Sequence, residues 1–442
     1  MDSTDLVRGE TIFALSTARG RAGVAVVRMS GPAARQALVA LAGRVPPARE
    51  ARLALLTDPD GGEEIDRALV LWFPGPDSFT GEDVAEFQIH GGTAVTAGLL
   101  AALGRIETCR LAEPGEFSRR AFENGKLDLT GAEGIADLVE AETSAQRRQA
   151  LRQLGGCFAR LTESWAARLV RALAHLEAAI DFPDEDLPGD LLPPIRAEAA
   201  LLAADIRRHL ADRRRGEILR DGLSVALIGP PNSGKSSLLN ALAGRDAAIV
   251  SAVAGTTRDV IEVHMDLAGY PVILADTAGL RESEDAIEQE GMRRSLARAE
   301  SADIVLIILD ISDPVSRETG LAARLPSGEA ITVWNKVDLA APPEGAFGVS
   351  AKTGAGLDAL VARLASSAEE RLGGTAPVVT RQRHREALEA CVTALDRTAQ
   401  IEEPALIAED LRLAMRALGR ITGKVDVEDL LDVIFRDFCI GK

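Results

Sequence analysis

The sequence GPPNSGKSSLLN occupies residues 229–240, just past the middle of a chain of 442 residues. The apolar run Leu223–Ile228 precedes it, and the apolar spacing of residues 238–242 is typical of a helix. A strand, a glycine-rich loop, Gly-Lys-Ser and a helix form the context that a phosphate-binding loop requires. We expect the backbone N–H groups of this loop to surround a phosphate chain, Lys235 to reach its terminal phosphates, and the Ser236 hydroxyl to bind Mg²⁺. The stretch therefore predicts an α/β domain that binds a nucleoside triphosphate.

Three further motifs follow in the order that a GTP-binding domain needs. Asp276-Thr277-Ala278-Gly279 follows a short apolar strand, so its aspartate can join the Mg²⁺ shell and its glycine N–H can meet the γ-phosphate. Asn335-Lys336-Val337-Asp338 ends another apolar strand, and its last carboxylate can accept hydrogen bonds from N1–H and the amino group of guanine. Adenine offers no such pair of donors, so the carboxylate would be left unpaired at a high cost. With Ser350-Ala351-Lys352 closing the base pocket, the ordered set predicts GTP as the nucleotide.

Length and composition limit the class of protein. A chain of 442 residues suffices for two or three domains, and 46% hydrophobic with 26% charged residues is typical of a globular protein. No apolar run is long enough to cross a bilayer, and the first residues lack the features of a signal peptide. The four cysteines form no CxxC pair. We therefore expect a cytoplasmic protein that contacts no membrane and has neither a disulfide framework nor a zinc site.

The net charge of −17 argues against a protein that binds nucleic acid through bulk electrostatics. If nucleic acid is the substrate, a local basic patch or a basic partner must attract it. The candidates are Arg119-Arg120, Arg147-Arg148 and Arg213-Arg214-Arg215, although short arginine pairs on helices more often form a solvated face.

The chain changes character along its length. An N-terminal part reads as mixed α/β, with strands expected at 24–27 and 68–73 and helices at 32–42 and 93–103. Helices dominate from about residue 129, where Thr130-Gly131-Ala132-Glu133 has a capping-box pattern. Further helices are expected at about 194–219, 381–401, 405–418 and 427–435. An α/β nucleotide domain thus interrupts an all-helical one, and the predicted domains are 1–125, 126–218, 219–375 and 376–442.

The residues that assist hydrolysis are not those of every GTPase. In Ras-type GTPases a glutamine follows Asp-x-x-Gly and orients the attacking water, but here Leu280 stands there and cannot hydrogen-bond water. Arg258 and Arg281 are candidates for an arginine finger, although loop arginines are usually solvated.

Asn232, the segment Gly255-Thr256-Thr257-Arg258-Asp259 and Leu280 resemble the potassium-activated class of translation-factor-related GTPases. The resemblance implies that Asn232 and backbone carbonyls of the switch I loop bind K⁺, where the ion offsets charge developing on the leaving oxygen. It also implies that Thr257 holds Mg²⁺ together with Ser236. In the family named next, the K⁺ shell is completed at the positions matching Ser251, Val253 and Thr256.

The whole chain resembles the MnmE (TrmE) family of tRNA-modification GTPases. The matching stretches are 11–16, 78–86, 114–122, 126–129 and 438–442. The resemblance implies an N-terminal α/β domain similar to tetrahydrofolate-binding modules, followed by a helical domain into which a Ras-like P-loop G domain is inserted. It further implies a homodimer through the N-terminal domain, with G domains that meet across the dimer when GTP and K⁺ are bound.

The resemblance implies a function as well. With the flavoprotein MnmG (GidA), in a heterotetramer, such proteins add an aminomethyl or carboxymethylaminomethyl group to C5 of the wobble uridine of certain tRNAs. The one-carbon unit is thought to come from a tetrahydrofolate, and 5-formyltetrahydrofolate or a related form is contacted at positions matching Arg28, Glu86, Lys126 and Lys442. A cation for the glutamyl carboxylates and a carboxylate for the pterin N–H groups suit that ligand. Without the resemblance, surface ion pairing explains Arg28, Glu86 and Lys126 equally well.

Carried onto this sequence, the family's GTP contacts fall in five segments. They comprise Asn232, Ser233, Gly234, Lys235, Ser236, Ser237, Ser251, Ala252, Val253, Ala254, Gly255, Thr256, Thr257, Asp276, Thr277, Ala278, Gly279, Asn335, Lys336, Val337, Asp338, Ser350, Ala351 and Lys352. The resemblance gives catalytic roles to Asn232 and to Glu288, a glutamate past Asp-x-x-Gly that acts through water; a helix-capping role is the alternative for Glu288. Cys439 lies between Phe438 and Ile440 with no histidine nearby in sequence, a setting typical of a buried, inert thiol.

Two other functions stay open on the sequence. One is a ribosome-assembly GTPase of the same potassium-dependent class, which would carry a KH domain or a second glycine loop that this sequence does not show. The other is a folate-binding regulator that only gates the flavoprotein with GTP, because no acid–base pair stands out beyond the GTP motifs.

Overall fold

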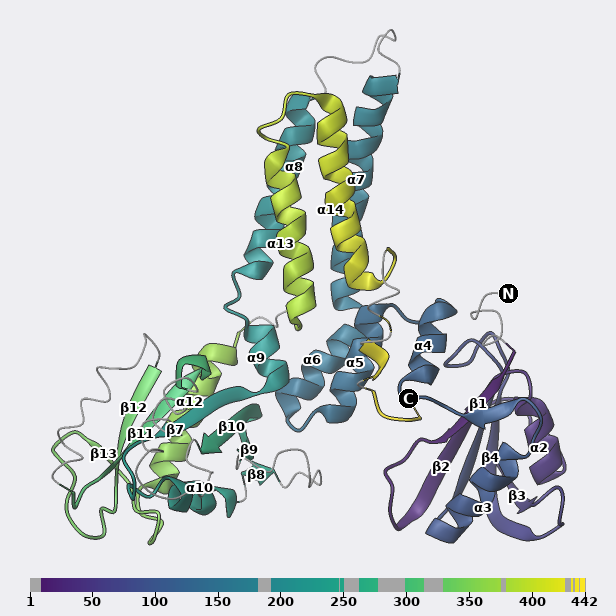
Figure 1. Cartoon of the computed structure of the whole chain (residues 1–442), viewed down its shortest axis with the longest axis horizontal. Coiled ribbons are helices and arrows are strands. Elements are labelled where there is room, and N and C mark those ends of the chain that lie inside the picture. Colours follow the sequence, from purple (N-terminus) through teal and green to yellow (C-terminus); the bar gives the residue numbers. More distant parts are fainter. Residues whose placement is uncertain are drawn as a thin grey trace, which may run out of the picture. The chain divides into compact units, whose positions relative to one another are not determined.

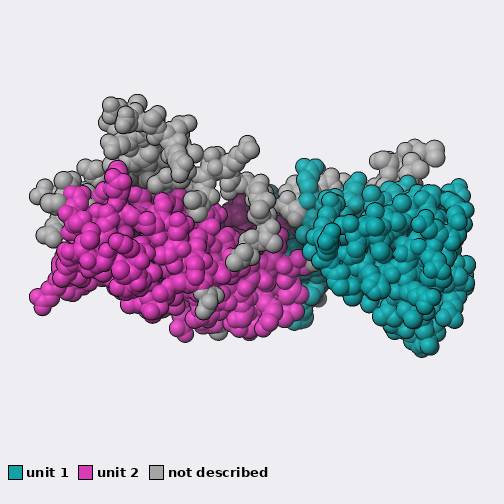
Figure 2. Space-filling model, turned by 90° about the horizontal axis from the view of Figure 1, so that it is seen from below, with its two compact units in different colours: residues 1–136, 153–195, 400–442 teal, residues 137–152, 196–399 magenta. Residues whose placement is uncertain are grey.

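The computed structural model describes residues 9–181, 192–245, 247–249, 262–276, 299–313, 329–374, 379–425, 431, 434–436 and 438–441. The chain divides into two compact units. As Figure 2 shows, unit 1 comprises residues 1–136, 153–195 and 400–442, and unit 2 comprises residues 137–152 and 196–399. This division follows spatial contacts, whereas the four predicted domain ranges follow changes in the sequence and remain predictions.

Unit 1 begins with a six-stranded sheet in the order β3-β4-β5-β2-β1-β6, in which β6 runs parallel to β1 and the other pairs are antiparallel. The strands are β1 (Thr11–Leu15), β2 (Ala22–Ser30), β3 (Arg52–Thr57), β4 (Glu64–Phe73), β5 (Val84–Gly91) and β6 (Cys109–Leu111). The helices α2 (Ala34–Ala42) and α3 (Thr93–Gly104) contribute Leu38 and Leu99 to the core, where both are fully buried beside Phe87. The strands predicted at 24–27 and 68–73 and both predicted helices are confirmed.

The other described residues of unit 1 are mainly helical. They are α4 (Glu116–Glu123), most of α5 (Leu129–Glu140), α7 (Cys157–Asp181) and α14 (Pro404–Thr422). Helices α7 and α14 lie side by side although more than 200 residues separate them (Figure 1). Trp165 and Leu169 of α7 and Leu411 and Leu418 of α14 are almost completely buried, because each helix repeats an apolar residue every three to four positions on one face.

The capping box predicted at Thr130 is wrong. Helix α5 starts at Leu129, so Thr130 lies inside it, and Asp128 accepts the capping hydrogen bonds instead. Its Oδ1 receives the Thr130 hydroxyl at 2.6 Å and the Gly131 N–H at 2.8 Å. Aspartate caps as well as threonine does, and starting earlier lets Leu129 reach a core where it is fully buried with Phe435.

The C-terminal tail lies against the segment that precedes α4. Ile440 forms a β-bridge with Pro114, and the Gly115 N–H donates to the Cys439 carbonyl at 3.4 Å. The expectation that Cys439 is buried is wrong: its side chain is exposed, because the apolar anchor of the tail is Phe438, of which 8% is accessible.

Unit 2 is built on a seven-stranded sheet in the order β13-β12-β11-β7-β10-β9-β8. The strands are β7 (Leu223–Ile228), β8 (Ala248–Ile249), β9 (Glu262–Leu267), β10 (Tyr270–Asp276), β11 (Ile304–Asp310), β12 (Glu329–Asn335) and β13 (Phe347–Gly348). From β13 to β10 all neighbours are parallel, and β9 is antiparallel to β10 and to β8. The predicted strands at 223–228, 271–275 and 331–334 are confirmed. Because the five parallel strands end at one edge of the sheet, the loops that follow them meet there.

The helices of unit 2 cover this sheet and extend from it (Figure 1). They are α6 (Ser144–Leu154, up to residue 152), α8 (Leu192–Leu210, from residue 196), α9 (Arg215–Asp221), α10 (Lys235–Ala243), α12 (Leu357–Leu372) and α13 (Gln382–Arg397). The single helical run expected at 194–219 is in fact two helices, because Arg213 and Arg214 adopt left-handed φ angles of 56° and 60°. None of the helices in the described ranges is both long and apolar enough to span a membrane.

Candidate functional site

The phosphate-binding loop lies between β7 and α10, pressed against the ends of two neighbouring strands. A Cβ added to Gly229 would lie 2.1 Å from the Ile308 carbonyl oxygen on β11, and one added to Gly234 would lie 2.3 Å from Asn335 Nδ2 on β12. Gly234 also has a φ of 89°, which favours glycine. These two positions thus require glycine for close approach, which explains the sequence pattern in this structure.

Lys235 is the first residue of α10 and bends back over the loop. Its ammonium donates to the carbonyl oxygens of Gly229 at 2.9 Å and of Pro230 at 3.0 Å. Only 9% of the residue is accessible, and burial lowers the pKa of Lys235 below its ordinary value, although the charge of Asp276 partly offsets this effect. A phosphate group beside this ammonium would stabilise its charged form.

Ser236 and Asp276 meet at the end of β10. The Ser236 hydroxyl donates to Asp276 Oδ2 at 2.6 Å, and Asp276 is 1% accessible. A hydroxyl and a carboxylate are both oxygen ligands, and Mg²⁺ in phosphate sites is typically held by one or two such groups together with water and phosphate oxygens. The pair therefore fits the predicted magnesium site. Among the described residues no group of three or more His, Cys, Asp or Glu is suited to a metal ion.

Asn335 connects the loops of the site from a buried position of 1% accessibility. Its side-chain N–H₂ donates to the Ser233 carbonyl at 2.9 Å, and its Oδ1 accepts the N–H groups of Lys336 at 2.8 Å and of Ala351 at 3.1 Å. One amide thus joins the phosphate-binding loop to both segments predicted to bind guanine. In this structure Asn335 acts as a positioning residue.

Asp338 is the residue predicted to recognise guanine. Its Oδ1 accepts the Ser350 hydroxyl at 2.5 Å, and this hydrogen bond lowers the pKa of Asp338, which keeps the carboxylate ionised and able to accept from a base. The structure therefore brings the Asn335–Asp338 and Ser350–Lys352 segments together, as the motif order predicts.

Asp310 is a residue of the site that the sequence analysis missed. It ends β11 in register with Asn335, and its carboxylate pairs with Lys336 Nζ at 2.5 Å. Burial raises the pKa of Asp310, but hydrogen bonds from Lys336 and Ser312 lower it by more, so the group stays ionised. Its place at the end of an apolar strand, like Asp276, is the signal that could have identified it.

Several predicted residues lie outside the described part of the chain. These are Ser251, Ala252, Val253, Ala254, Gly255, Thr256, Thr257, Thr277, Ala278, Gly279, Glu288 and Lys442. Asn232 is described and has a φ of 61° at the tip of the phosphate-binding loop.

The residues predicted to bind folate lie in unit 1. Arg28 on β2 and Glu86 on β5 stand opposite one another in the sheet, and Arg28 Nη2 lies 2.8 Å from Glu86 Oε1. The guanidinium also lies 5.6 Å from the centre of the Phe79 ring. Lys126 lies beside the loop of residues 78–83, since a Cβ at Gly81 would be 3.4 Å from Lys126 Cγ. Three of the four predicted side chains thus belong to one region, and their role stays a prediction.

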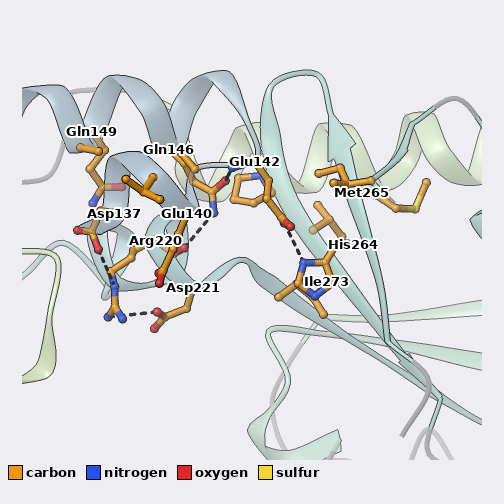
Figure 3. A pocket seen from close by; sticks show the side chains of 16 residues that line it. Asp137, Glu140, Glu142, Gln146, Gln149, Arg220, Asp221, His264, Met265 and Ile273 are labelled. Atoms are coloured by element: carbon orange, nitrogen blue, oxygen red, sulfur yellow. Dashed lines mark hydrogen bonds and ion pairs between the residues drawn. The ribbon is translucent and has the colours of Figure 1, made fainter. Parts of the chain in front are cut away.

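Unit 2 also contains a cavity of about 680 Å³ that none of the predicted site residues lines. Figure 3 shows it between the α5–α6 region, α9 and strands β9 and β10. His264 Nδ1 on β9 lies 2.8 Å from Glu142 Oε2, and Arg220 Nε of α9 lies 3.3 Å from Asp137 Oδ1. The first contact attaches the antiparallel edge of the sheet to the helical segment before α6, and the second attaches α9 to it.

Comparisons with known proteins cover nearly the whole chain. The model of the "GTP-binding protein TrmE N-terminus" matches residues 11–126, and that of the "MnmE helical domain" matches residues 129–439. The "tRNA modification GTPase MnmE" of Parvibaculum lavamentivorans is 58% identical over 98% of this chain and 100% of its own length. The protein of the same name from Rhodospirillum rubrum is 56% identical over 98% of this chain and 99% of its own.

Among solved structures, the G domain of the FeoB iron transporter from T. maritima is 27% identical to the part it matches. It covers 33% of this chain and 97% of that chain with a TM-score of 0.26. The family models and relatives confirm the predicted fold class, an N-terminal α/β domain and a helical domain together with a Ras-like GTPase domain.

Proposed function

The chain belongs to the MnmE family of tRNA modification GTPases, and we propose that it uses GTP hydrolysis to control a modification at C5 of the wobble uridine. In this proposal a flavoprotein of the MnmG type is its partner, and the added group is aminomethyl or carboxymethylaminomethyl. The GTP-binding part of the proposal rests on one observation. Lys235, Asp276 and Asp338 lie at the same edge of the sheet, where the buried Asn335 joins the loops of the site. We also propose that the protein acts in the cytoplasm.

The side chains of the site would support hydrolysis in two ways: they would bind the nucleotide, and they would hold the cations that neutralise its charge. Lys235 would contact the terminal phosphates, and Ser236 and Thr257, with Asp276 beside them, would hold Mg²⁺. Mg²⁺ held there would supply positive charge that offsets the negative charge of the phosphates during hydrolysis. Asp338 would orient the nucleotide through the base. Glu288 would position the attacking water, since Leu280 cannot.

Potassium is the proposed second cation. Asn232 stands in the phosphate-binding loop, where its amide oxygen would be a ligand of the ion beside the phosphates. Ser251, Val253 and Thr256 would supply the remaining ligands. A monovalent cation there would stabilise the leaving oxygen, as an arginine finger does in other GTPases.

A tetrahydrofolate site in unit 1 is the proposed source of the one-carbon unit. Arg28 and Glu86 are held side by side, with 25% and 15% of their side chains accessible, so both can be reached by a ligand. A folate contains carboxylates for Arg28, Lys126 or Lys442 and pterin N–H groups for Glu86.

A homodimer through unit 1 is supported by an apolar surface on its sheet. Strand β3 is an edge strand, and Leu53, Leu55 and Leu69 on β3 and β4 are 64%, 38% and 40% accessible. Exposed leucines on a free edge favour pairing with another chain.

The decisive test is mass spectrometry of tRNA nucleosides from a strain that lacks this protein. We expect the C5 modification at the wobble uridine to disappear and to return when the unchanged gene is supplied. A Lys235→Ala variant, expressed at the same level, should fail to restore it because its phosphate contacts are lost. Full modification in the deletion strain would contradict the proposed function.

A further inference from the structure

Of the three arginine clusters that the sequence offers for RNA, the first is engaged by carboxylates and the cluster at 213–215 is engaged in part. Arg120 is 5% accessible and lies 3.0 Å from Glu82 Oε2 and 3.1 Å from Glu116 Oε1, while Arg119 pairs with Glu123 at 3.1 Å. In the cluster at 213–215, Arg214 pairs with Glu217 at 2.5 Å, while the neighbouring Arg213 is exposed and forms no ion pair with any described residue. Arginines paired in this way are poor donors to a phosphate backbone, because binding must first break the ion pair.

Helix α6 carries the remaining cluster, and the environment there is different. Arg147, Arg148 and Arg152 are exposed, and none of them forms an ion pair with any residue in the described ranges. The only hydrogen bond of these side chains there is from Arg148 Nη1 to the Ser144 hydroxyl, at 3.2 Å. Helix α6 contains no aspartate or glutamate, in a chain with 67 acidic and 50 basic residues. These three arginines, with the 48% accessible Leu151 between them, form the α6 surface.

The packing of α6 keeps the arginines pointing outward. The Gln149 amide donates to the Gly216 carbonyl at 2.8 Å, and the Gln146 amide donates to the Arg220 carbonyl at 3.0 Å. At 100° per residue these two glutamines lie on the opposite side of the helix from Arg147, Arg148 and Leu151. The helix is thus attached to α9 by one face (Figure 1), and Arg147, Arg148 and Leu151 on the other face are exposed.

The beginning of α6 is equally well fixed. Thr143 and Gln146 form a capping box, in which Gln146 Oε1 accepts the Thr143 N–H at 3.0 Å. The Ala145 N–H donates to the Gly269 carbonyl at 3.0 Å, and Gly269 lies in the turn between β9 and β10. The second strand of that hairpin ends at Asp276. A ligand on the α6 surface would therefore bind an element that is hydrogen-bonded to the hairpin leading to the proposed magnesium site.

We propose that the α6 surface binds the phosphate backbone of the tRNA substrate. The inference rests on the proposed function, since that function supplies the polyanion. A chain with a net charge of −17 repels RNA at long range, so a direct contact requires a local group of cations that are not already neutralised. Arg147, Arg148 and Arg152 provide such a group on a rigid helix, and arginine can donate to phosphate with two N–H groups at once.

The test measures binding of an unmodified tRNA transcript with a wobble uridine to the full-length chain over a range of salt concentrations. In the Arg147→Gln/Arg148→Gln/Arg152→Gln variant we expect affinity at low salt to fall by about tenfold or more. The slope of log K against log salt should become shallower by about 2 to 3, for three lost phosphate contacts. Replacing the same residues by lysine should retain most of the binding, because the charge is kept.

The matched control is Arg207→Gln/Arg208→Gln/Arg412→Gln, which removes the same charge from two exposed arginines and one half-buried arginine, paired with Asp396, Asp205 and Glu177. It should bind tRNA nearly as the unchanged protein does. Equal losses in both glutamine variants would mean that only net charge matters and would overturn the inference, as would no loss in either. A folding defect would show as a lowered unfolding temperature together with loss of tRNA binding in the lysine variant. That pattern would contradict the proposal that the α6 surface binds tRNA. If the unchanged chain binds no tRNA although the deletion strain lacks the modification, the inference fails while the proposed function stands.

Discussion

Gly234→Ala is the substitution whose effect the structure defines most sharply. A Cβ there would lie 2.3 Å from Asn335 Nδ2, and Asn335 is 1% accessible, so the amide has no room to move aside without losing its partners. Those partners are the Ser233 carbonyl and the N–H groups of Lys336 and Ala351. Losing three hydrogen bonds costs about 3 kcal/mol, and an alanine at a left-handed φ costs about 1–2 kcal/mol more.

The total is about 4–5 kcal/mol, a large part of the 5–15 kcal/mol typical of a folded protein. Gly345→Ala is the matched control, because Gly345 has a similar φ of 73° and nothing within 4 Å of an added Cβ. We expect it to cost only the backbone part, about 1–2 kcal/mol. The difference of about 3 kcal/mol between two Gly→Ala variants therefore isolates the contact with Asn335.

The assay is urea unfolding followed by tryptophan fluorescence. Trp334 lies beside Asn335 on β12 and reports on unit 2, whereas the other two tryptophans, Trp72 and Trp165, belong to unit 1, whose transition should be the same in both variants. The transition of unit 2 should shift far more in Gly234→Ala than in Gly345→Ala, and GTP affinity should fall only in the former. Equal destabilisation by the two substitutions would refute the claim that Asn335 is held rigidly between the loops.

Three further outcomes are expected. Asp338→Asn should weaken binding of a fluorescent GTP analogue by about 100-fold or more, since a charge-assisted acceptor is worth about 3 kcal/mol. The affinity for ATP should stay unchanged. An equal loss of affinity for both nucleotides would reject base recognition by this residue. GTP hydrolysis should be about 100-fold faster in K⁺ than in Na⁺, and Asn232→Ala should remove that difference; a K⁺ effect that survives the substitution would exclude Asn232 as a ligand. Burial raises the pKa of Glu116, but hydrogen bonds from Arg110 and the Glu113 N–H lower it by more, so the group is stabilising when ionised. Glu116→Gln should therefore destabilise unit 1 at pH 7. In urea unfolding, the difference in free energy of unfolding from the unchanged protein should shrink as the pH falls below about 4.3. A difference that stays constant down to about pH 3 would contradict this assignment.

Local sequence patterns predicted most of the helices and strands. The run Leu223–Ile228 and the strands before Asp276 and Asn335 agree with the structure because a buried parallel strand must be apolar along its whole length. Predictions failed where two neighbouring residues could each have played the same structural role. Asp128 and Thr130 are both good helix caps, and only the burial of Leu129 decides between them. Cys439 likewise has apolar neighbours on both sides, and only the docking of Phe438 shows which side chain faces inward.

By itself, the sequence determined that the chain binds GTP, because each motif combines a strand end with the polar groups that one part of the nucleotide needs. Tertiary structure alone decided how those parts are joined. Asn335 reaches the Ser233 carbonyl across 102 residues of sequence, and Asp310 pairs with Lys336, because β7, β11 and β12 are neighbours in the sheet. The tertiary structure also decided which arginines form ion pairs. Arg120 meets its carboxylates only after folding, whereas the arginines of α6 meet no carboxylate among the described residues. Such pairings depend on strand order and helix packing, which distant parts of the chain set together.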